Sequence, residues 1–465
     1  MRLRILPPIV VLLAGAIAPL GAQDAADSLV EAALRRYRTP GISIAVTRDG
    51  RVIKSAGYGF ANLELRVPAT DSTVYQTGSI GKAFTAALVL SLVQDGKLGL
   101  DDPVAKFFPN PPSAWRRVTI RHLLTHTSGI ADGIYDLVDL RQDYTDDQMV
   151  AKIRTAKVEA PPGARWSYSN QGYHLLGYLI NRSQGRFYGD LLQERIFRPL
   201  GMASTRIIDE AAIIPHRAAG YRLLRDIASP LANQEYASPS LNRTADGSIY
   251  TTVLDMARWD LGLYGDTPLD SASRAVSWTP VRLTSGKTFP YGFAWQTDSV
   301  NGHWVVEHSG AWQGFTTHIA RYPDDHLGVI VLTNCACGDP TRVAHDLAAL
   351  YLPALRPAAE PPLADQDPDV MRRLGRALES LAEGTADSTA FTPAALRRWN
   401  PEARAEWATY FRALGPAGTP QLQSRHAQRR TTGYQFHVTL GDIVHGGWVT
   451  FTRDGRIEEL ELNPE

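Results

Sequence analysis

Strand-like apolar runs bracket the first and longer part of the chain. The runs 42–47 and 52–58 are joined by Asp49-Gly50, a dipeptide that favours a tight hairpin because both residues tolerate positive φ. A helical pattern at 27–37 precedes them. The later elements are strand-like runs at 291–296, 304–308, 316–322 and 327–333, followed by a helical pattern at 341–351.

The interval between these runs is mainly helical. A long helical pattern follows Ser79 and stops near Asp95-Gly96, and residues 105–264 hold further helices and loops. Strands from distant parts of the chain, with helices inserted between them, predict one sheet flanked by helices and a helical lobe beside it. The expected fold class is therefore α+β, with a cleft between sheet and lobe as the natural place for a site.

A proline-rich stretch separates this part from a second unit. Residues 353–368 hold five prolines among Ala, Asp and Glu, which is typical of a linker. Beyond it, 370–383 and 393–414 have helical patterns. Residues 433–440, 447–453 and 456–462 alternate like strands. We therefore predict a main domain over 24–352, a linker over 353–368 and a small accessory α+β domain over 369–465.

The first 22 residues have the pattern of a secretory signal peptide. Arg2 and Arg4 precede an apolar run from residue 5 to 20, and Gly21-Ala22 offers a small-residue cleavage site. The run is short for a membrane-spanning helix and contains three prolines. An uncleaved membrane anchor is the alternative interpretation. We expect an exported protein, periplasmic or extracellular.

Composition narrows the possible partners. The 465 residues carry 48 basic and 48 acidic side chains, so long-range attraction to nucleic acid or to an anionic membrane is not expected.

The two cysteines, Cys335 and Cys337, are separated by one residue. In an extended strand their side chains would run parallel on one face, so we expect no disulfide between them.

Ser79 and Lys82 are the first candidates for chemistry. They lie three residues apart at the start of an expected helix, so their side chains share one face. A serine hydroxyl becomes a good nucleophile only when a base takes its proton, and a lysine with a pKa lowered by burial can assist. The helix N-terminus also offers N–H groups to a developing oxyanion. By itself, a Ser-x-x-Lys pair is weak evidence for a catalytic site, because many chains contain one by chance, with the lysine exposed to solvent on a helix face.

Two further segments carry polar groups suited to the same chemistry. Tyr168 and Asn170 flank one residue in a loop that enters a helix. A phenol beside a lysine can act as base and then as acid, and the amide can orient the lysine or hold a substrate carbonyl. His308 ends a strand, and Gly310 allows a ligand to approach the backbone closely. The N–H groups of Ser79 and Ala311 can then form an oxyanion hole.

Together and in this order, the three segments resemble the active-site motifs of the penicillin-recognising serine hydrolases. The resemblance is to the branch of class C β-lactamases and DD-peptidases, of which the segments 123–129 (Leu-Leu-Thr-His-Thr-Ser-Gly) and 197–202 (Phe-Arg-Pro-Leu-Gly-Met) are also typical. It covers residues 27–351 and implies the β-lactamase/DD-peptidase fold, in which the sheet is antiparallel. It further implies Ser79 as the acylated nucleophile, Lys82 and Tyr168 as the proton-transfer pair, and a site lined by Asn170, His308, Ser309, Gly310 and Ala311.

One position departs from the β-lactamase pattern. His308 stands where β-lactamases of this branch carry the Lys of a Lys-Thr-Gly strand, and a mostly neutral histidine is a weaker anchor for a carboxylate. Strong β-lactamase activity is therefore not expected. The resemblance implies no cofactor and no metal. His122 and His126, four apart on an expected helix, lack the adjacent Glu of a His-Glu-x-x-His zinc site.

These observations predict a hydrolase that cleaves an amide or ester through a Ser79 acyl-enzyme. A DD-peptidase-like enzyme or D-amino-acid peptidase acting on small or peptidoglycan-derived substrates comes first. A carboxylesterase or a weak β-lactamase is the alternative. A non-catalytic penicillin-binding or sensing protein is a third interpretation. The presence of every motif residue argues against it. The oligomeric state is left open.

Overall fold

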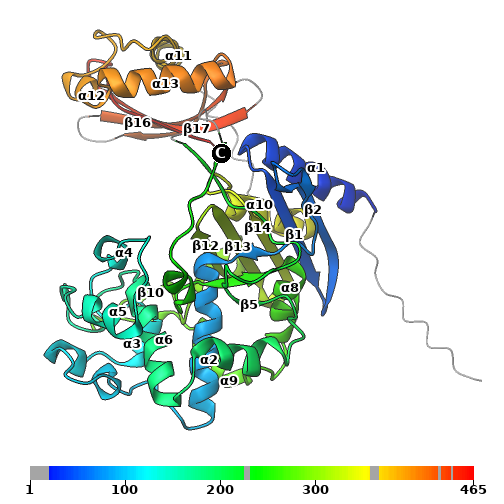
Figure 1. Cartoon of the computed structure of the whole chain (residues 1–465). Coiled ribbons are helices and arrows are strands. Elements are labelled where there is room, and N and C mark those ends of the chain that lie inside the picture. The colour runs from blue at the N-terminus through cyan, green and yellow to red at the C-terminus, as the bar shows by residue number, and fades with distance from the viewer. Residues whose placement is uncertain (1–19, 225–230, 357–365, 428–430, 441–442, 465) are drawn as a thin grey trace, which may run out of the picture.

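The computed structural model describes residues 20–224, 231–356, 366–427, 431–440 and 443–464. Two units are visible in Figure 1, a larger one around a seven-stranded sheet and a smaller one around a four-stranded sheet. Most of the predicted signal peptide lies outside the described residues, which begin with helix α1 (Leu20–Arg36). None of the described helices combines the length and apolar character needed to cross a bilayer.

The large sheet joins strands from both ends of the main unit. All neighbouring strands are antiparallel, and β1 lies between β2 and β14, with Ala45 opposite Ile330. The expected α+β fold with one antiparallel sheet is confirmed. In sheet order the strands are β11 (Gln296–Val300), β12 (His303–Trp312), β13 (Phe315–Tyr322), β14 (Leu327–Thr333), β1 (Gly41–Arg48), β2 (Arg51–Asn62) and β3 (Val67–Pro68).

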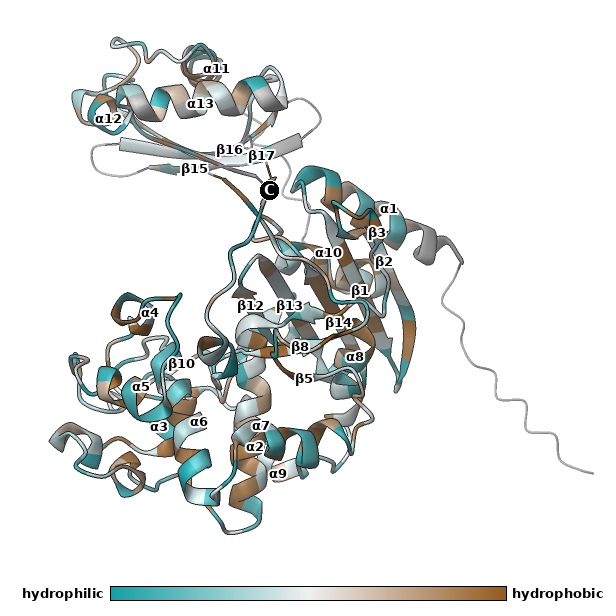
Figure 2. Ribbon diagram, in the orientation of Figure 1, coloured by the Kyte–Doolittle hydropathy of each residue, from teal (hydrophilic) through white to brown (hydrophobic). Residues whose placement is uncertain are grey.

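Helices cover both faces of this sheet. Helices α1 and α10 (Pro340–Tyr351) pack on one face, and α8 (Val253–Gly262) packs against β1 and β14 on the other. Strand β14 is buried at every position, as expected for a strand covered on both sides. In Figure 2 the apolar colouring gathers on the sheet, while the outer helices are largely polar on their solvent side.

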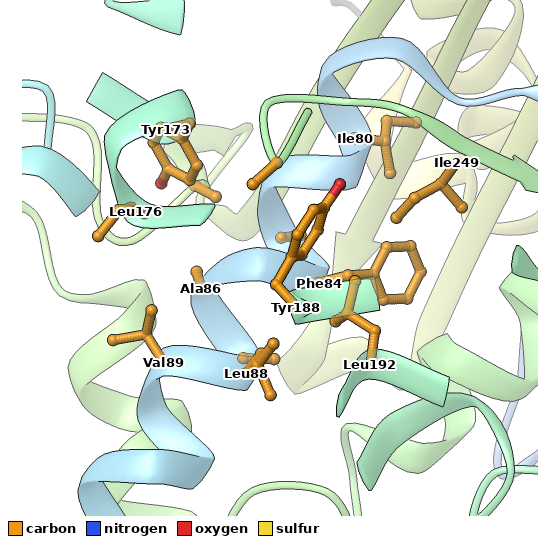
Figure 3. Close-up of a cluster of buried hydrophobic side chains, with 14 of the residues drawn as sticks. Ile80, Phe84, Ala86, Leu88, Val89, Tyr173, Leu176, Tyr188, Leu192 and Ile249 are labelled. Carbon is orange, nitrogen blue, oxygen red and sulfur yellow. The ribbon is translucent and has the colours of Figure 1, made fainter. Parts of the chain in front are cut away.

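The helical lobe is built around a buried helix, α2 (Gly81–Gln94). The Phe84 ring packs against the rings of Phe197 and Trp259, with centroids 5.4 and 4.6 Å away. Figure 3 shows this core around α2. The other helices beside the sheet are α3 (Ile120–Leu124), α4 (Ile134–Leu137), α5 (Asp146–Ile153), α6 (Asn170–Gln184), α7 (Tyr188–Leu192) and α9 (Ser271–Trp278). Short strands pair as β4 (Tyr75–Gln76), β8 (Ile249–Thr251) and β5 (Arg206–Ile207), as β6 (Tyr221–Leu223) and β7 (Leu231–Asn233), and as β9 (Val281–Arg282) and β10 (Thr288–Phe289).

The predicted strand at 291–296 is wrong. Tyr291 bridges to Gln296 and the chain turns between them, so strand β11 begins only at Gln296. Phe293 and Trp295 are both buried, and so is Ala294 between them. The apolar run therefore fills the core from a turn instead of alternating between two faces of a sheet.

The smaller unit has a hydrophobic core made of its own residues, which include Leu374, Phe391 and Phe436. Its predicted second helix is two helices, because Pro401 starts a new one. Strand β15 was not predicted, since only its second residue, Leu422, is buried. The division of the chain at 353–368 stays a prediction. The elements are α11 (Pro368–Ala382), α12 (Pro393–Arg398), α13 (Pro401–Leu414), β15 (Gln421–Ala427), β16 (Thr431–Leu440), β17 (Ile443–Thr452) and β18 (Ile457–Pro464).

The two cysteines form a disulfide, contrary to expectation. Strand β14 ends at Thr333, and Cys335 and Cys337 lie in the turn that follows. The turn brings their Cα atoms to 5.0 Å and the sulfurs into bonding contact. The argument from parallel side chains on an extended strand does not apply, because the segment is not extended.

A buried ion pair joins the sheet to helix α8. The guanidinium of Arg321 on β13 donates to the carboxylate of Asp260, and both side chains are fully buried. Thr47 also donates to this carboxylate, at 2.5 Å. Replacing Asp260 by Asn is expected to lower the free energy of unfolding by about 3–5 kcal/mol, because it leaves Arg321 as an uncompensated buried charge. Urea unfolding measures this.

The matched control is Asp346→Asn, which breaks the exposed pair between Arg342 and Asp346 on α10. That change is expected to cost less than about 1 kcal/mol, since exposed pairs are screened by solvent. Equal losses in the two variants would contradict the account of the buried pair.

Candidate active site

The nucleophile candidate, Ser79, lies in a tight turn against the C-terminal part of strand β12. The turn is the 3-10 segment η1 (Gly78–Ile80), which leads into α2. A Cβ added to Gly78 would lie 2.5 Å from the amide nitrogen of Ala311. One added to Gly310 would lie 3.0 Å from the amide nitrogen of Ser79. Glycines at both positions therefore let the two backbones touch, which brings the two candidate oxyanion-hole amides together.

Lys82 is the centre of the polar network. Its ammonium nitrogen lies 3.0 Å from Ser79 Oγ, 2.8 Å from Asn170 Oδ1 and 2.7 Å from the carbonyl oxygen of Asp246, and the residue is fully buried. A charged lysine satisfies these contacts with three N–H donors. A neutral lysine keeps two donors for the amide and carbonyl oxygens, and its lone pair then faces the Ser79 hydroxyl. The geometry thus suits proton transfer between Ser79 and Lys82.

Asn170 is held in one orientation by Asp132. The carboxylate of Asp132 accepts from the side-chain Nδ2 of Asn170 at 3.2 Å and from its backbone amide at 3.0 Å. Because a carboxylate only accepts, Nδ2 faces Asp132 and Oδ1 faces Lys82. The N-cap of helix α6 is Ser169, whose Oγ accepts from the Gly172 amide. Asn170 is therefore not the N-cap, and the oxygen of its side-chain amide is available to accept from Lys82.

Tyr168 lies above Lys82 at the mouth of the site. The lysine nitrogen is 4.9 Å from the centre of the Tyr168 ring, and this ring packs on His126 at 4.3 Å between centroids. Tyr168 and Ser79 line the same cavity. The structure therefore brings Ser79, Lys82, Tyr168 and Asn170 together, as the sequence predicted.

His308 is turned into the wall of the site. Its Nε2 faces the hydroxyl of Tyr291 at 3.0 Å, and its Nδ1 faces the carbonyl oxygen of Ser309 at 2.5 Å. Burial lowers the pKa of His308 to about 3, and Lys82 acts in the same direction. His308 is thus neutral with both ring nitrogens engaged, so it offers a substrate carboxylate no positive charge.

A directed chain of hydrogen bonds fixes this neutral state. The Ser169 amide donates to Nδ1 of His126, so Nε2 of His126 carries the hydrogen and faces Tyr291 at 3.2 Å. Tyr291 can then donate only to His308, which leaves Nδ1–H of His308 for the Ser309 carbonyl. The chain begins at an obligatory backbone donor and ends at an obligatory acceptor. A proton added to either histidine would break it.

The main cavity has a volume of about 610 Å³ and opens beside Ser79. One side is aromatic, with Trp166 stacked on Phe289 at 4.2 Å. No lysine or arginine is among its lining residues in the described part of the chain, and Asp339 supplies a carboxylate. A smaller cavity of about 80 Å³ lies on the other side of Ser79, between Tyr135, Asp246 and Trp312.

The sequence model of the family described as Beta-lactamase matches residues 26–354. The chain belongs to the beta-lactamase family. It is a serine hydrolase, and the resemblance drawn from the three motifs is confirmed.

Two relatives of this beta-lactamase-family protein are informative. Penicillin-binding protein 4* of Bacillus subtilis is 31% identical over 309 residues, which cover 63% of this chain and 67% of the relative. A D-aminopeptidase of Gluconobacter oxydans is 30% identical over 356 residues, covering 74% of this chain and 64% of the relative. The chain thus spans about two thirds of the length of each.

Among solved structures, the octameric penicillin-binding protein homologue from Pyrococcus abyssi is similar over 95% of this chain and 98% of its own, with a TM-score of 0.64 and 25% identity. A D-stereospecific amidohydrolase from Streptomyces covers 69% of this chain and 97% of its own, with a TM-score of 0.58 and 27% identity. The first similarity extends beyond the family match into the smaller unit.

Several residues of this family member's site were not predicted from sequence. Asp132 and Tyr135 follow the predicted segment 123–129, but no motif pointed to them. Tyr135 donates to the buried carboxylate of Asp246 at 2.8 Å. Burial raises the pKa of Asp246, but His174 and Lys82 lower it more, so this carboxyl stays ionised beside the lysine. The contact from Asp246 to Lys82 is made by a backbone carbonyl, which leaves no side-chain signal.

The expectation that His122 and His126 lie on one helix is wrong. Helix α3 ends at Leu124, and His126 has a φ of 56°, so the two rings do not share a helix face. His122 contacts Thr119, while His126 contacts Ser169 and Tyr291. The two histidines therefore serve separate hydrogen-bond networks.

The buried state of His126 predicts how stability depends on pH. Burial lowers its pKa well below 6.5, so below pH 6.5 the unfolded state binds more protons and stability falls as the pH drops. Replacing His126 by Asn is expected to shrink the loss of unfolding free energy between pH 7.5 and 5.5 by about 1.4 kcal/mol. Urea unfolding at both values measures it. The control is His426→Asn, which replaces an exposed histidine and leaves the buried hydrogen-bond chain intact. An unchanged pH dependence in His126→Asn would contradict the neutral chain.

Proposed function

We propose that this serine hydrolase cleaves the amide bond that follows an N-terminal D-amino acid with a free amino group. Ser79 attacks the carbonyl, Lys82 takes the hydroxyl proton, and the amides of Ser79 and Ala311 bind the oxyanion. Lys82 or Tyr168 returns a proton to the leaving amine, and water then releases the acyl group. The contact between Lys82 Nζ and Ser79 Oγ at 3.0 Å carries the acyl-enzyme part of the proposal.

The charge of the cleft supports an amino-terminal substrate over a carboxy-terminal one. A carboxypeptidase or a β-lactamase must hold a substrate carboxylate, which a lysine or arginine does best. Here His308 is neutral and the lining residues named above include no such cation, while Asp339 adds a carboxylate to the lining. Similarity to a D-aminopeptidase and to a D-stereospecific amidohydrolase points in the same direction.

A panel of chromogenic substrates tests this proposal. D-alanine p-nitroanilide is compared with its L-isomer, its N-acetylated form, p-nitrophenyl butyrate and a chromogenic cephalosporin, on wild type and Ser79→Ala. We expect the free D-amide to have the largest kcat/KM, at least tenfold above the N-acetylated form, and to need Ser79. Faster turnover of the ester or the cephalosporin would replace the proposal by an esterase or a β-lactamase. Turnover unaffected by Ser79→Ala would remove the acyl-enzyme.

We also propose that the protein is exported and loses its first 22 residues. The charged start, the short apolar run and the Gly21-Ala22 site support this. N-terminal sequencing of the protein recovered from the periplasm or medium should give Gln23 as the first residue. Recovery only from the cytoplasm with Met1 retained would contradict export.

A further inference from the structure

Three side chains of metal-binding type converge outside the catalytic network. Glu307 on β12, His318 on β13 and His345 on α10 place one ligand atom each within 4.8 Å of one another. His318 and His345 lie 11 and 38 positions from Glu307 along the chain, so no short sequence motif joins them. The fold alone brings them together, at the point where α10 packs on the sheet.

The distances in this cluster approach those of a metal centre. Glu307 Oε2 lies 3.2 Å from His318 Nε2 and 2.8 Å from His345 Nε2. Two ligands on bonds of about 2.0 Å at the tetrahedral angle are about 3.3 Å apart. The His345 side chain is 32% exposed, so its ring has room to turn toward a shared ion, while His318 and Glu307 are buried.

A second layer of contacts orients the buried histidine. Nδ1 of His318 lies 2.9 Å from Ser309 Oγ and 3.1 Å from Thr341 Oγ1. A histidine that binds a metal through one nitrogen usually uses its other nitrogen for such a hydrogen bond, which fixes its tautomer and ring angle. Ser309 and Thr341 both line the catalytic cavity, so the cluster lies directly behind its wall.

The local charge also suits a cation. One carboxylate oxygen of Glu307, Oε2, faces both imidazoles. The carboxylates of Asp346 and Asp298 lie near His345, and that of Asp339 lies near His318. A glutamate and two imidazoles, with further carboxylates nearby, form a ligand set for a borderline divalent ion, with one position left for water.

We propose that Glu307, His318 and His345 bind one divalent transition ion of the zinc type. The ion joins β12 to α10 behind the wall that carries Ser309. Its role is to hold this wall in place, so it stabilises the protein and is not a reactant in hydrolysis. Magnesium and calcium, which prefer six or more oxygen ligands, are expected not to bind.

Metal uptake by the full chain tests the proposal directly. Chelator-treated wild type is titrated with Zn²⁺ against a chromogenic competitor, and thermal unfolding is followed with and without the ion. We expect one Zn²⁺ per chain with a dissociation constant below about 1 µM, and a rise in Tm of several degrees at a hundredfold excess over that constant. No uptake below about 100 µM would show that the cluster is only a hydrogen-bonded network and would overturn the proposal.

Variants locate the ion. His345→Ala removes a partly exposed ligand from a helix surface and is expected to weaken binding at least a hundredfold, and Glu307→Gln should do the same. The control is His303→Ala, which breaks another histidine–carboxylate contact on β12, to Asp325 at 2.9 Å. Equal zinc affinity in His345→Ala and His303→Ala would overturn the assignment. Because the readout is metal uptake, the result is independent of the proposed peptidase activity.

Discussion

Alanine in place of Lys82 is expected to lower kcat/KM for D-alanine p-nitroanilide about 10⁴-fold, because Ser79 loses its proton acceptor. The buried lysine holds three contacts at 2.7–3.0 Å, so its removal also frees Asn170 and the Asp246 carbonyl. Steady-state kinetics give the overall loss, and rapid-mixing experiments show whether acylation or deacylation slows. We expect acylation to become limiting.

The exchange of Lys82 for Arg separates proton transfer from charge. A guanidinium keeps the positive charge but does not lose its proton in proteins, so it cannot serve as base. Lys82→Arg is therefore expected to be as inactive as Lys82→Ala. Lys287→Ala, which removes an exposed lysine, is the control and should retain wild-type kinetics. Substantial activity in Lys82→Arg would assign the base to Tyr168 and leave Lys82 an electrostatic role.

The pairing of Ser79 with Lys82 could be predicted because it depends only on helical spacing. Two residues three apart at a helix start share a face wherever the helix lies. Asn170 comes from another helix, so its place beside the lysine required the resemblance as well as the residues. Asp132 and the Asp246 carbonyl complete the site through long-range packing, which no local pattern encodes.

A strand could be predicted from the sequence where its whole length has the same surroundings. Strand β14 was predicted at 327–333, its observed bounds, because both of its faces are buried and its run of Leu, Val and Ile is continuous. The run at 291–296 is equally apolar, yet it forms a turn because its aromatic side chains fill the lobe. The disulfide between Cys335 and Cys337 was missed for a related reason: the end of a strand was extrapolated through a turn.

The role of His308 could not be inferred from its residue type alone. From sequence, a histidine in place of a lysine is a weaker anchor for anions. In the structure it is no anchor, because Tyr291 and the Ser309 carbonyl occupy both ring nitrogens. The hydrogen-bond chain that starts at the Ser169 amide decides this, and its members lie between His126 and Ser309, about 180 residues apart in the sequence, so only the fold reveals it.

Alanine in place of Gly310 is expected to lower kcat about 10²–10³-fold, the range for loss of one oxyanion-hole donor. The added Cβ would lie 2.0 Å from the carbonyl oxygen of Thr77 and 3.0 Å from the amide of Ser79. Both neighbours are backbone, so strand β12 has to move away from the turn that holds the nucleophile. The amides of Ser79 and Ala311 then no longer point at one oxygen.

The control for this substitution is Gly265→Ala, whose added Cβ would meet nothing closer than 3.7 Å. It should leave kcat and the melting temperature near the wild-type values. Because Gly310→Ala also strains the β12 edge, its effect on kcat is read only under conditions where circular dichroism shows a folded protein. The rate of labelling of Ser79 by a phosphonate ester should fall in parallel with kcat, since the phosphonate oxygen occupies the same hole. A folded Gly310→Ala protein with kcat within fivefold of wild type would mean that the oxyanion is stabilised elsewhere, and the role assigned to Ala311 would be lost.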